Sequence, residues 1–181
     1  MKALRGALPA LLVGIVACTP EPSRESSPAA DTAWTVTPSG YGPLRAGMTL
    51  AQARAAVPGR LAEPAMSEGS EGCGHATLTG EPRGVLAMIV DGKVARVEVR
   101  DAAVLTDKGA RVGDSEARIK SLYAGQVITE PHKYTDGHYL VVRPTEPADS
   151  AYRLIFETDG KAVIEYRAGT MPQVGWVEGC S

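Results

Sequence analysis

Residues 45–53 read RAGMTLAQA, and residues 111–119 repeat this stretch in degraded form as RVGDSEARI, 66 positions later. Both copies place Gly two residues after Arg, a hydroxyl residue two further on, and Ala two after that. Thr49 and Ser115 stand where a helix N-cap belongs, and apolar residues follow at i, i+3, i+4 spacing. The sequence therefore predicts two short helices, over 50–57 and 116–123.

Each predicted helix is followed by a candidate strand and then by a hairpin, because Asp-Gly between alternating apolar residues is a strong turn signal. The candidate strands are His75–Thr79 and His138–Arg143, and the hairpins pair Val85–Val90 with Val94–Arg100 and Tyr152–Glu157 with Val163–Arg167. This order predicts an α+β fold of two tandem helix-then-antiparallel-strand repeats, with the helices on one face of a sheet. We expect repeat 1 over 33–105 and repeat 2 over 106–181, together forming one compact unit.

Alternation along the hairpin strands assigns side chains to the two faces of the predicted sheet. The face toward the helices receives Leu86, Met88, Val97, Val99, Leu154, Phe156, Ile164 and Tyr166. The opposite face mixes Ile with Arg and Glu, which suits a contact surface for a protein or a solvated face with scattered apolar residues. As partner-binding residues we nominate Ile89, Arg96, Arg100, Ile155 and Arg167. On an exposed face, charge reversal at Arg96 and Arg167 should leave stability nearly unchanged.

The sequence GMTLAQA at 47–53 resembles the G-M-T-x-x-[EQ]-[AV] opening of known helix-then-sheet domains. Such domains occur in small outer-membrane lipoproteins of the SmpA/OmlA type and, in tandem, in the β-lactamase-inhibitor-protein fold. The resemblance implies a helix packed on a sheet whose other face contacts proteins. It carries no catalytic residues.

The start of the chain has the layout of a secretory signal, with a basic beginning and an apolar run at 8–17 that is too short to remain as a membrane span. Ile15-Val16-Ala17-Cys18 resembles the lipobox of bacterial lipoproteins, which implies removal of residues 1–17 and lipidation of Cys18. An ordinary signal peptide cut elsewhere is the alternative. Residues 18–32, rich in Pro, Ser, Glu and Ala, then form a disordered tether.

The expected cellular location of the protein follows from this segment. Acyl chains on Cys18 anchor a protein firmly to a membrane. Thr19 rather than Asp follows the lipid site, which by the same resemblance favours the outer membrane, facing the periplasm. In that oxidising compartment Cys73 and Cys180 are most simply a disulfide pair closing a loop of about 107 residues. Two free thiols or an intermolecular bond remain the competing interpretations.

The rest of the sequence names no chemistry. His75, His132 and His138 lack the spacing of a helical metal site, no nucleophile elbow is present, and scattered basic residues exclude a nucleic-acid surface. We expect the protein to bind no metal and no cofactor, and we expect it not to be an enzyme. Trp176 could be an interface anchor or a sugar-stacking platform, or it could pack over the disulfide.

The sequence thus predicts a non-catalytic, membrane-anchored envelope lipoprotein that binds or scaffolds a protein partner at the membrane surface. One alternative is a periplasmic inhibitor of a hydrolase, which should present a protruding loop such as Glu130–Gly137. Another is a small-ligand or carbohydrate binder, which should show an enclosed pocket. A scaffold should instead show a broad, partly apolar sheet face.

Overall fold

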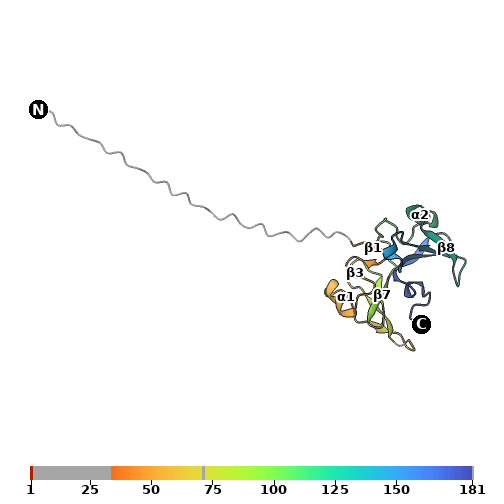
Figure 1. The fold of residues 1–181 in the computed structure, drawn as a ribbon, viewed down its shortest axis with the longest axis horizontal. Coiled ribbons are helices and arrows are strands. Elements are labelled where there is room, and N and C mark those ends of the chain that lie inside the picture. Colours follow the sequence, from red (N-terminus) through yellow and green to blue (C-terminus); the bar gives the residue numbers. More distant parts are fainter. Residues whose placement is uncertain (2–33, 71, 181) are drawn as a thin grey trace. The chain divides into compact units, whose positions relative to one another are not determined.

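The structure, a computed structural model, describes residue 1, residues 34–70 and residues 72–180. The predicted lipidation site Cys18 and tether 18–32, and the predicted signal peptide after Met1, lie outside the described residues. Residues 34–180 belong to one compact unit (Figure 1). Within these residues no helix is long and apolar enough to cross a membrane.

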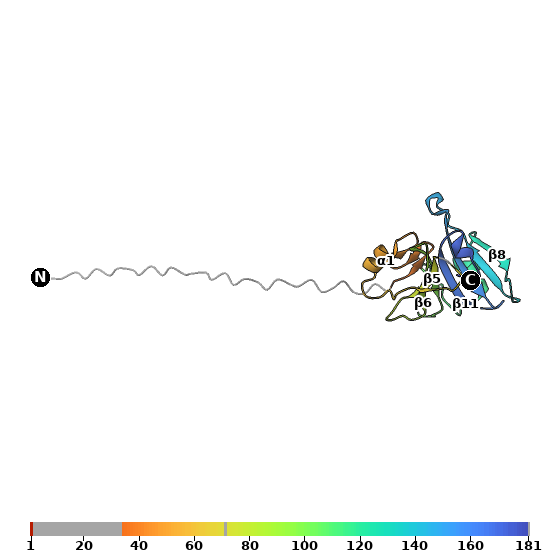
Figure 2. The same cartoon turned by 90° about the horizontal axis from the view of Figure 1, so that it is seen from below.

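The main sheet is continuous and antiparallel, with strand order β4-β5-β6-β7-β11-β10-β9-β8. Its strands are β4 (Ala65–Met66), β5 (Cys73–Thr77), β6 (Val85–Val90), β7 (Lys93–Val99), β8 (Val127–Pro131), β9 (His138–Val142), β10 (Tyr152–Thr158) and β11 (Val163–Thr170). Strands from the first half of the chain meet strands from the second half at the β7–β11 pair. Figures 1 and 2 show the two halves side by side, the first in orange to green and the second in cyan to blue.

One face of the main sheet carries the large core. The helices α1 (Leu50–Ala56) and α2 (Glu116–Leu122) contribute Ala53 and Ile119 to it. A small sheet of β1 (Val36–Thr37), β2 (Gly40–Tyr41) and β3 (Leu44–Arg45) adds further buried side chains to the same core. The helices and the small sheet therefore cover the same side.

Both helices begin where the sequence predicts. The Thr49 side chain accepts a hydrogen bond from the backbone N–H of Gln52, and the Gln52 side chain accepts one from the N–H of Thr49, which completes a capping box. Ser115 caps α2 through the N–H of Arg118. Each helix is nevertheless only seven residues long.

The predicted fold class is wrong. The part of the chain that the structure describes is mostly antiparallel β, with eleven strands in two sheets and only two short α-helices, so it is not an α+β fold of helix-then-strand repeats. Two reasons are visible. The helices stop after about two turns, and segments left unassigned from the sequence form additional strands: β1 to β3 before the first helix, β4 after it, and β8 after the second.

The predicted facing of side chains is also wrong in places. Residues 85–90 read VLAMIV and are apolar at every position, so alternation has no phase there. In the structure Ile89 lies in the large core, whereas Met88 packs on the opposite face with the cysteines. Ile164 is exposed because a β-bulge at Glu157/Thr158 shifts the pairing of β10 with β11.

Candidate functional site

The five residues nominated for partner binding do not form an open surface. Ile89, Arg96, Ile155 and Arg167 are each no more than 4% exposed, and only Arg100 reaches solvent. Ile89 moreover lies on the other face of the sheet, in the large core. The sequence predicted the arginines on the correct face, but this face is covered.

The cover is the last described segment of the chain, residues 171–180, which we call the C-terminal strap. It contains the 3-10 turn η2 (Gln173–Gly175), which packs against β7, β10 and β11. Val174 of this turn is fully buried in a small cluster with Tyr139, Val141 and Ile155. The strap thus occupies the middle of the face that the sequence assigned to a partner.

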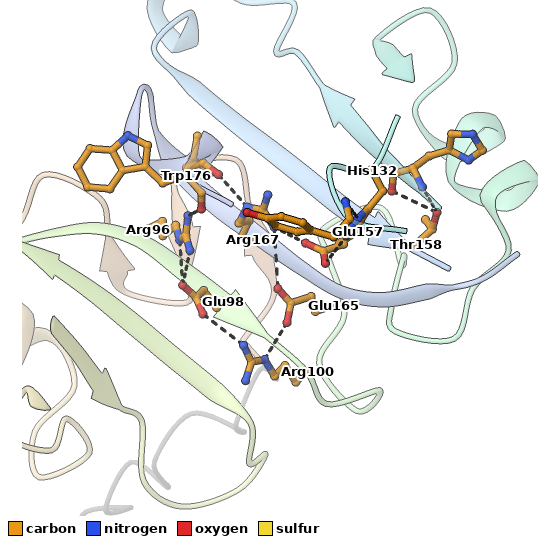
Figure 3. Close-up of polar contacts among 12 residues, drawn as sticks. Arg96, Glu98, Arg100, His132, Glu157, Thr158, Glu165, Arg167 and Trp176 are labelled. Atoms are coloured by element: carbon orange, nitrogen blue, oxygen red, sulfur yellow. Dashed lines mark hydrogen bonds and ion pairs between the residues drawn. The ribbon is translucent and has the colours of Figure 1, made fainter. Parts of the chain in front are cut away.

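Two buried arginines hold the strap by its backbone. Nη1 of Arg96 donates to the carbonyl oxygen of Trp176 at 2.6 Å (Figure 3) and to that of Gln173 at 2.8 Å. Nε of Arg167 donates to the carbonyl oxygen of Val174 at 2.8 Å. Hydrogen bonds from a charged donor are stronger than neutral ones. The arginines therefore bind the carbonyl groups of a 3-10 turn and of the residue that follows it, and that backbone belongs to the chain itself.

The same arginines belong to a charge network that crosses three strands. Glu98 accepts from Nε and Nη2 of Arg96 at 2.9 and 2.7 Å, and Glu157 accepts from Nη1 of Arg167 at 2.9 Å. Arg100 and Glu165 connect the two pairs. Nη2 of Arg100 lies 4.0 Å from Glu98 and its Nε donates to Glu165 at 2.8 Å, while Glu165 lies 3.9 Å from Nη1 of Arg167 (Figure 3). The network pairs each buried charge with an opposite charge, without which burying these side chains would be very unfavourable.

A histidine closes each end of this network. Nε2 of His75 lies 3.2 Å from Glu98, and Nε2 of His132 lies 2.9 Å from Glu157. Nδ1 of His132 accepts hydrogen bonds from the backbone N–H groups of Tyr134 (3.0 Å) and Thr135 (3.1 Å). Because Nδ1 is an acceptor, the proton of the neutral ring sits on Nε2 and is donated to Glu157.

The two central carboxylates are held in their ionised form. Burial alone would raise the pKa of Glu98, but the charges and hydrogen bonds of Arg96 and His75 outweigh it and lower the pKa below the ordinary value. Burial likewise opposes ionisation of Glu157, and hydrogen bonds from His132 and Arg167 lower the pKa of this carboxyl. Both carboxylates therefore act as fixed anions beneath the strap.

A disulfide fastens the end of the strap. Cys73 in β5 and Cys180 are bonded, with their Cα atoms 5.4 Å apart, which confirms the predicted pairing. The Ser70 hydroxyl donates to the carbonyl oxygen of Cys180. The predicted disulfide thus also fastens the C-terminal strap to β5, which the sequence did not predict.

Beside this bond lies an open groove of about 720 Å³. Both cysteines line it together with Ser70, Val90, Lys133 and Trp176. Trp176 is 39% exposed at this groove, so it remains available for contact while its backbone is held by Arg96.

The segment nominated as an inhibitory loop, Glu130–Gly137, is tied to the strap, although its first two residues belong to β8. Nζ of Lys133 lies 2.7 Å from a carboxylate oxygen of Glu178, and the Tyr134 hydroxyl donates to the same carboxylate. The Tyr134 side chain nonetheless remains well exposed. Loop and strap therefore present two aromatic side chains on a braced surface.

Elsewhere in residues 34–70 and 72–180, no group of three or more His, Cys, Asp or Glu side chains is arranged to hold a metal ion. His138 instead pairs with Glu116 at 2.7 Å, and the Thr158 hydroxyl donates to the same carboxylate. This cluster joins the first turn of α2 to the β9 and β10 strands.

Sequence reasoning missed Glu98, Glu157 and His132 as members of the site. A signal was present in the alternation of residues 96–100, RVEVR, and 165–167, EYR, since same-face Arg and Glu on adjacent central strands pair across them. What the sequence lacked was the strap, because residues 171–180 show no regular periodicity.

Comparison with known proteins identifies a fold neighbour. The chain matches no protein-family model and no curated protein. Among solved structures it is similar to the uncharacterized protein yfeY from Escherichia coli, with a TM-score of 0.50 and 17% sequence identity, over 75% of this chain and 99% of that one. A likeness at this identity shows the fold alone, and it assigns no catalytic activity.

Proposed function

We propose that this chain is a non-catalytic lipoprotein of the cell envelope that binds a protein partner. In this proposal Cys18 carries the lipid, the tether spans the distance to the membrane, and residues 34–180 form the binding module. The disulfide supports export, since such bonds persist in oxidising compartments. We place the protein at the outer membrane, facing the periplasm.

The observation that carries the binding proposal is the braced aromatic pair Trp176 and Tyr134. Trp and Tyr are enriched among residues that dominate protein contacts, and a rigid backbone reduces the entropy lost on binding. Arg96 holds the backbone of Trp176, and Glu178 holds the ring of Tyr134. We therefore move the proposed contact from the covered sheet face to the outer side of the strap and loop.

An inhibitor of a hydrolase remains the second candidate, on one specific observation. The Glu130–Gly137 loop is fixed at His132 by Glu157 and at Tyr134 by Glu178, while its Tyr134 ring projects into solvent. Inhibitory loops need this combination of rigidity and exposure. The groove is open rather than enclosed, which gives less support to a small-ligand binder.

The proposal is tested by crosslinking in intact cells with Trp176→Ala. We expect this variant to lose most of the proteins captured by the wild type, since truncating a central aromatic contact weakens binding by about 2 kcal/mol, or roughly thirtyfold. The matched control is Ile164→Ala, because Ile164 is exposed to a similar extent but does not line the groove. Equal capture by both variants would remove the aromatic pair as the binding surface.

The anchor is tested in the same cells. Cys18→Ser should abolish fatty-acid labelling and move the protein out of the membrane fraction, because the acyl chains supply the attachment. A wild-type protein that takes up no labelled fatty acid contradicts the lipoprotein assignment, whatever the crosslinking shows.

A further inference from the structure

The Cys73–Cys180 bond lies in the wall of the open groove. Each cysteine is only 5% exposed, so a reagent reaches the sulfurs through the groove or not at all in the folded protein. The groove is large enough, at about 720 Å³, to admit a small-molecule reagent. A bond that is buried on one side and bordered by an open groove on the other differs from a disulfide enclosed in a core.

The two sulfurs are held differently. Cys73 sits in β5, paired with Val90 of β6, and is fixed by the sheet. Cys180 stands at the end of the strap, outside any strand or helix. If the bond opens, Cys180 is therefore the partner that moves.

Opening the bond would expose a prepared surface. The strap covers Arg96 and Arg167, whose donors engage three of its carbonyl oxygens, and it fills the apolar cluster around Ile155 with Val174. Without the strap these donors and this cluster face solvent, while Glu98 and Glu157 still hold the arginines in place. The covered face has the chemistry of a site for the carbonyl groups of a peptide turn.

We propose that the groove is a site of thiol–disulfide exchange, at which a dithiol reductant opens the Cys73–Cys180 bond and releases the strap from the sheet. A thiolate of the reductant attacks Sγ of Cys180, the S–S bond breaks, and Cys73 leaves as a thiolate that takes up a proton. The second thiol of the reductant then attacks the reductant's first sulfur, which is bonded to Sγ of Cys180 in the mixed disulfide. This frees Cys180 as a thiol and leaves the reductant as a disulfide. Two electrons pass from the dithiol to the protein.

The first test measures reduction of the folded, full-length protein by dithiothreitol, with free thiols trapped by a maleimide and counted by mass. Through the groove, the rate should rise in proportion to dithiothreitol and exceed the rate of global unfolding by about tenfold or more. The unfolding rate is obtained from urea-jump kinetics. A reduction rate that saturates at the unfolding rate overturns the proposal, because the bond would then open only in the unfolded chain.

The second test locates the route and the moving part. Trp176→Ala widens the groove and should accelerate reduction by a few fold, whereas Ile164→Ala should leave it unchanged; equal rates overturn the route. In hydrogen exchange, amides of residues 173–180 should exchange about tenfold faster after reduction while those of β7 and β10 remain protected. Cys180→Ser, once circular dichroism shows that it folds, should reproduce this pattern, and a strap that stays protected in both forms overturns the release.

Discussion

At the scale of single residues, the decisive feature is that Arg96 and Arg167 are buried. Alternation along β7 and β11 predicted which face they occupy, because the polar–apolar pattern there is regular. It could not predict their burial, since that depends on a segment packed over them. A central Arg flanked by same-face Glu reads equally well as a solvated row of charges, and only the strap distinguishes the two.

Arg167→Met should therefore lower the free energy of unfolding by about 3–5 kcal/mol, because it leaves Glu157 without its arginine partner and the Val174 carbonyl oxygen without its donor. This replaces the expectation that changes at Arg167 are neutral. Urea denaturation monitored by tryptophan fluorescence measures it. The control is Arg100→Met, where an exposed ion pair predicts a change of about 0–1 kcal/mol.

A double variant separates charge from packing. Adding Glu157→Gln to Arg167→Met removes the unpaired anion and should restore part of the lost stability, since replacing both members of a buried pair is often nearly neutral. If the double variant is less stable than Arg167→Met alone, the unpaired carboxylate is not the source of the loss.

At the scale of elements, local signals predicted what is locally determined. The four strands of the two predicted hairpins and the strand that precedes each hairpin are present. Both helix N-caps are also correct, because turn chemistry and capping act within a few residues. The phase of β6 was lost because VLAMIV carries no alternation. The small sheet and the strap were missed because two-residue strands and 3-10 turns leave almost no pattern.

The cap of α1 offers a test at this scale. Thr49→Ala removes the side-chain acceptor for the Gln52 N–H, which is one half of the capping box, and should lower stability by about 1 kcal/mol. Thr49→Ser keeps the hydroxyl and should stay within a few tenths of a kcal/mol of the wild type. Thermal unfolding followed by circular dichroism compares the two, and equal losses would show that the hydroxyl contributes nothing.

At the scale of the whole molecule, the continuous sheet joins both halves of the chain, and its two faces differ in kind. One face is an ordinary apolar core, and the other is a charged layer closed by a strap. The number of cysteines and the expected compartment predicted the disulfide, but not that the segment it fastens would cover a charged layer. Such a layer makes the stability of the entire module depend on the ionisation of a few carboxylates.

Stability should consequently fall in acid. The pKa values of Glu98, Glu116 and Glu157 are lowered by folding, so their contribution is full above the unfolded-state pKa of about 4.5 and is lost as the pH falls through the folded values. We expect the melting temperature to be nearly level from pH 7 to about 5 and to drop below about 4.5. Calorimetry across pH 7–3 measures this. The drop should be shallower in Glu157→Gln, and an unchanged slope would contradict the assignment.

The position of the disulfide also determines how this protein carries mechanical load. Suppose tension is applied between the start of the folded module and a partner gripping Trp176. The path runs along the chain to Cys73, crosses the bond to Cys180, and turns back only four residues. The chain between residues 74 and 175 is enclosed by this bond, so β6 to β11 and α2 cannot be pulled out in length while the bond is closed. While the bond is closed, stretching can lengthen the module only through the chain that precedes Cys73; once it is reduced, the chain of the main sheet can be extended as well.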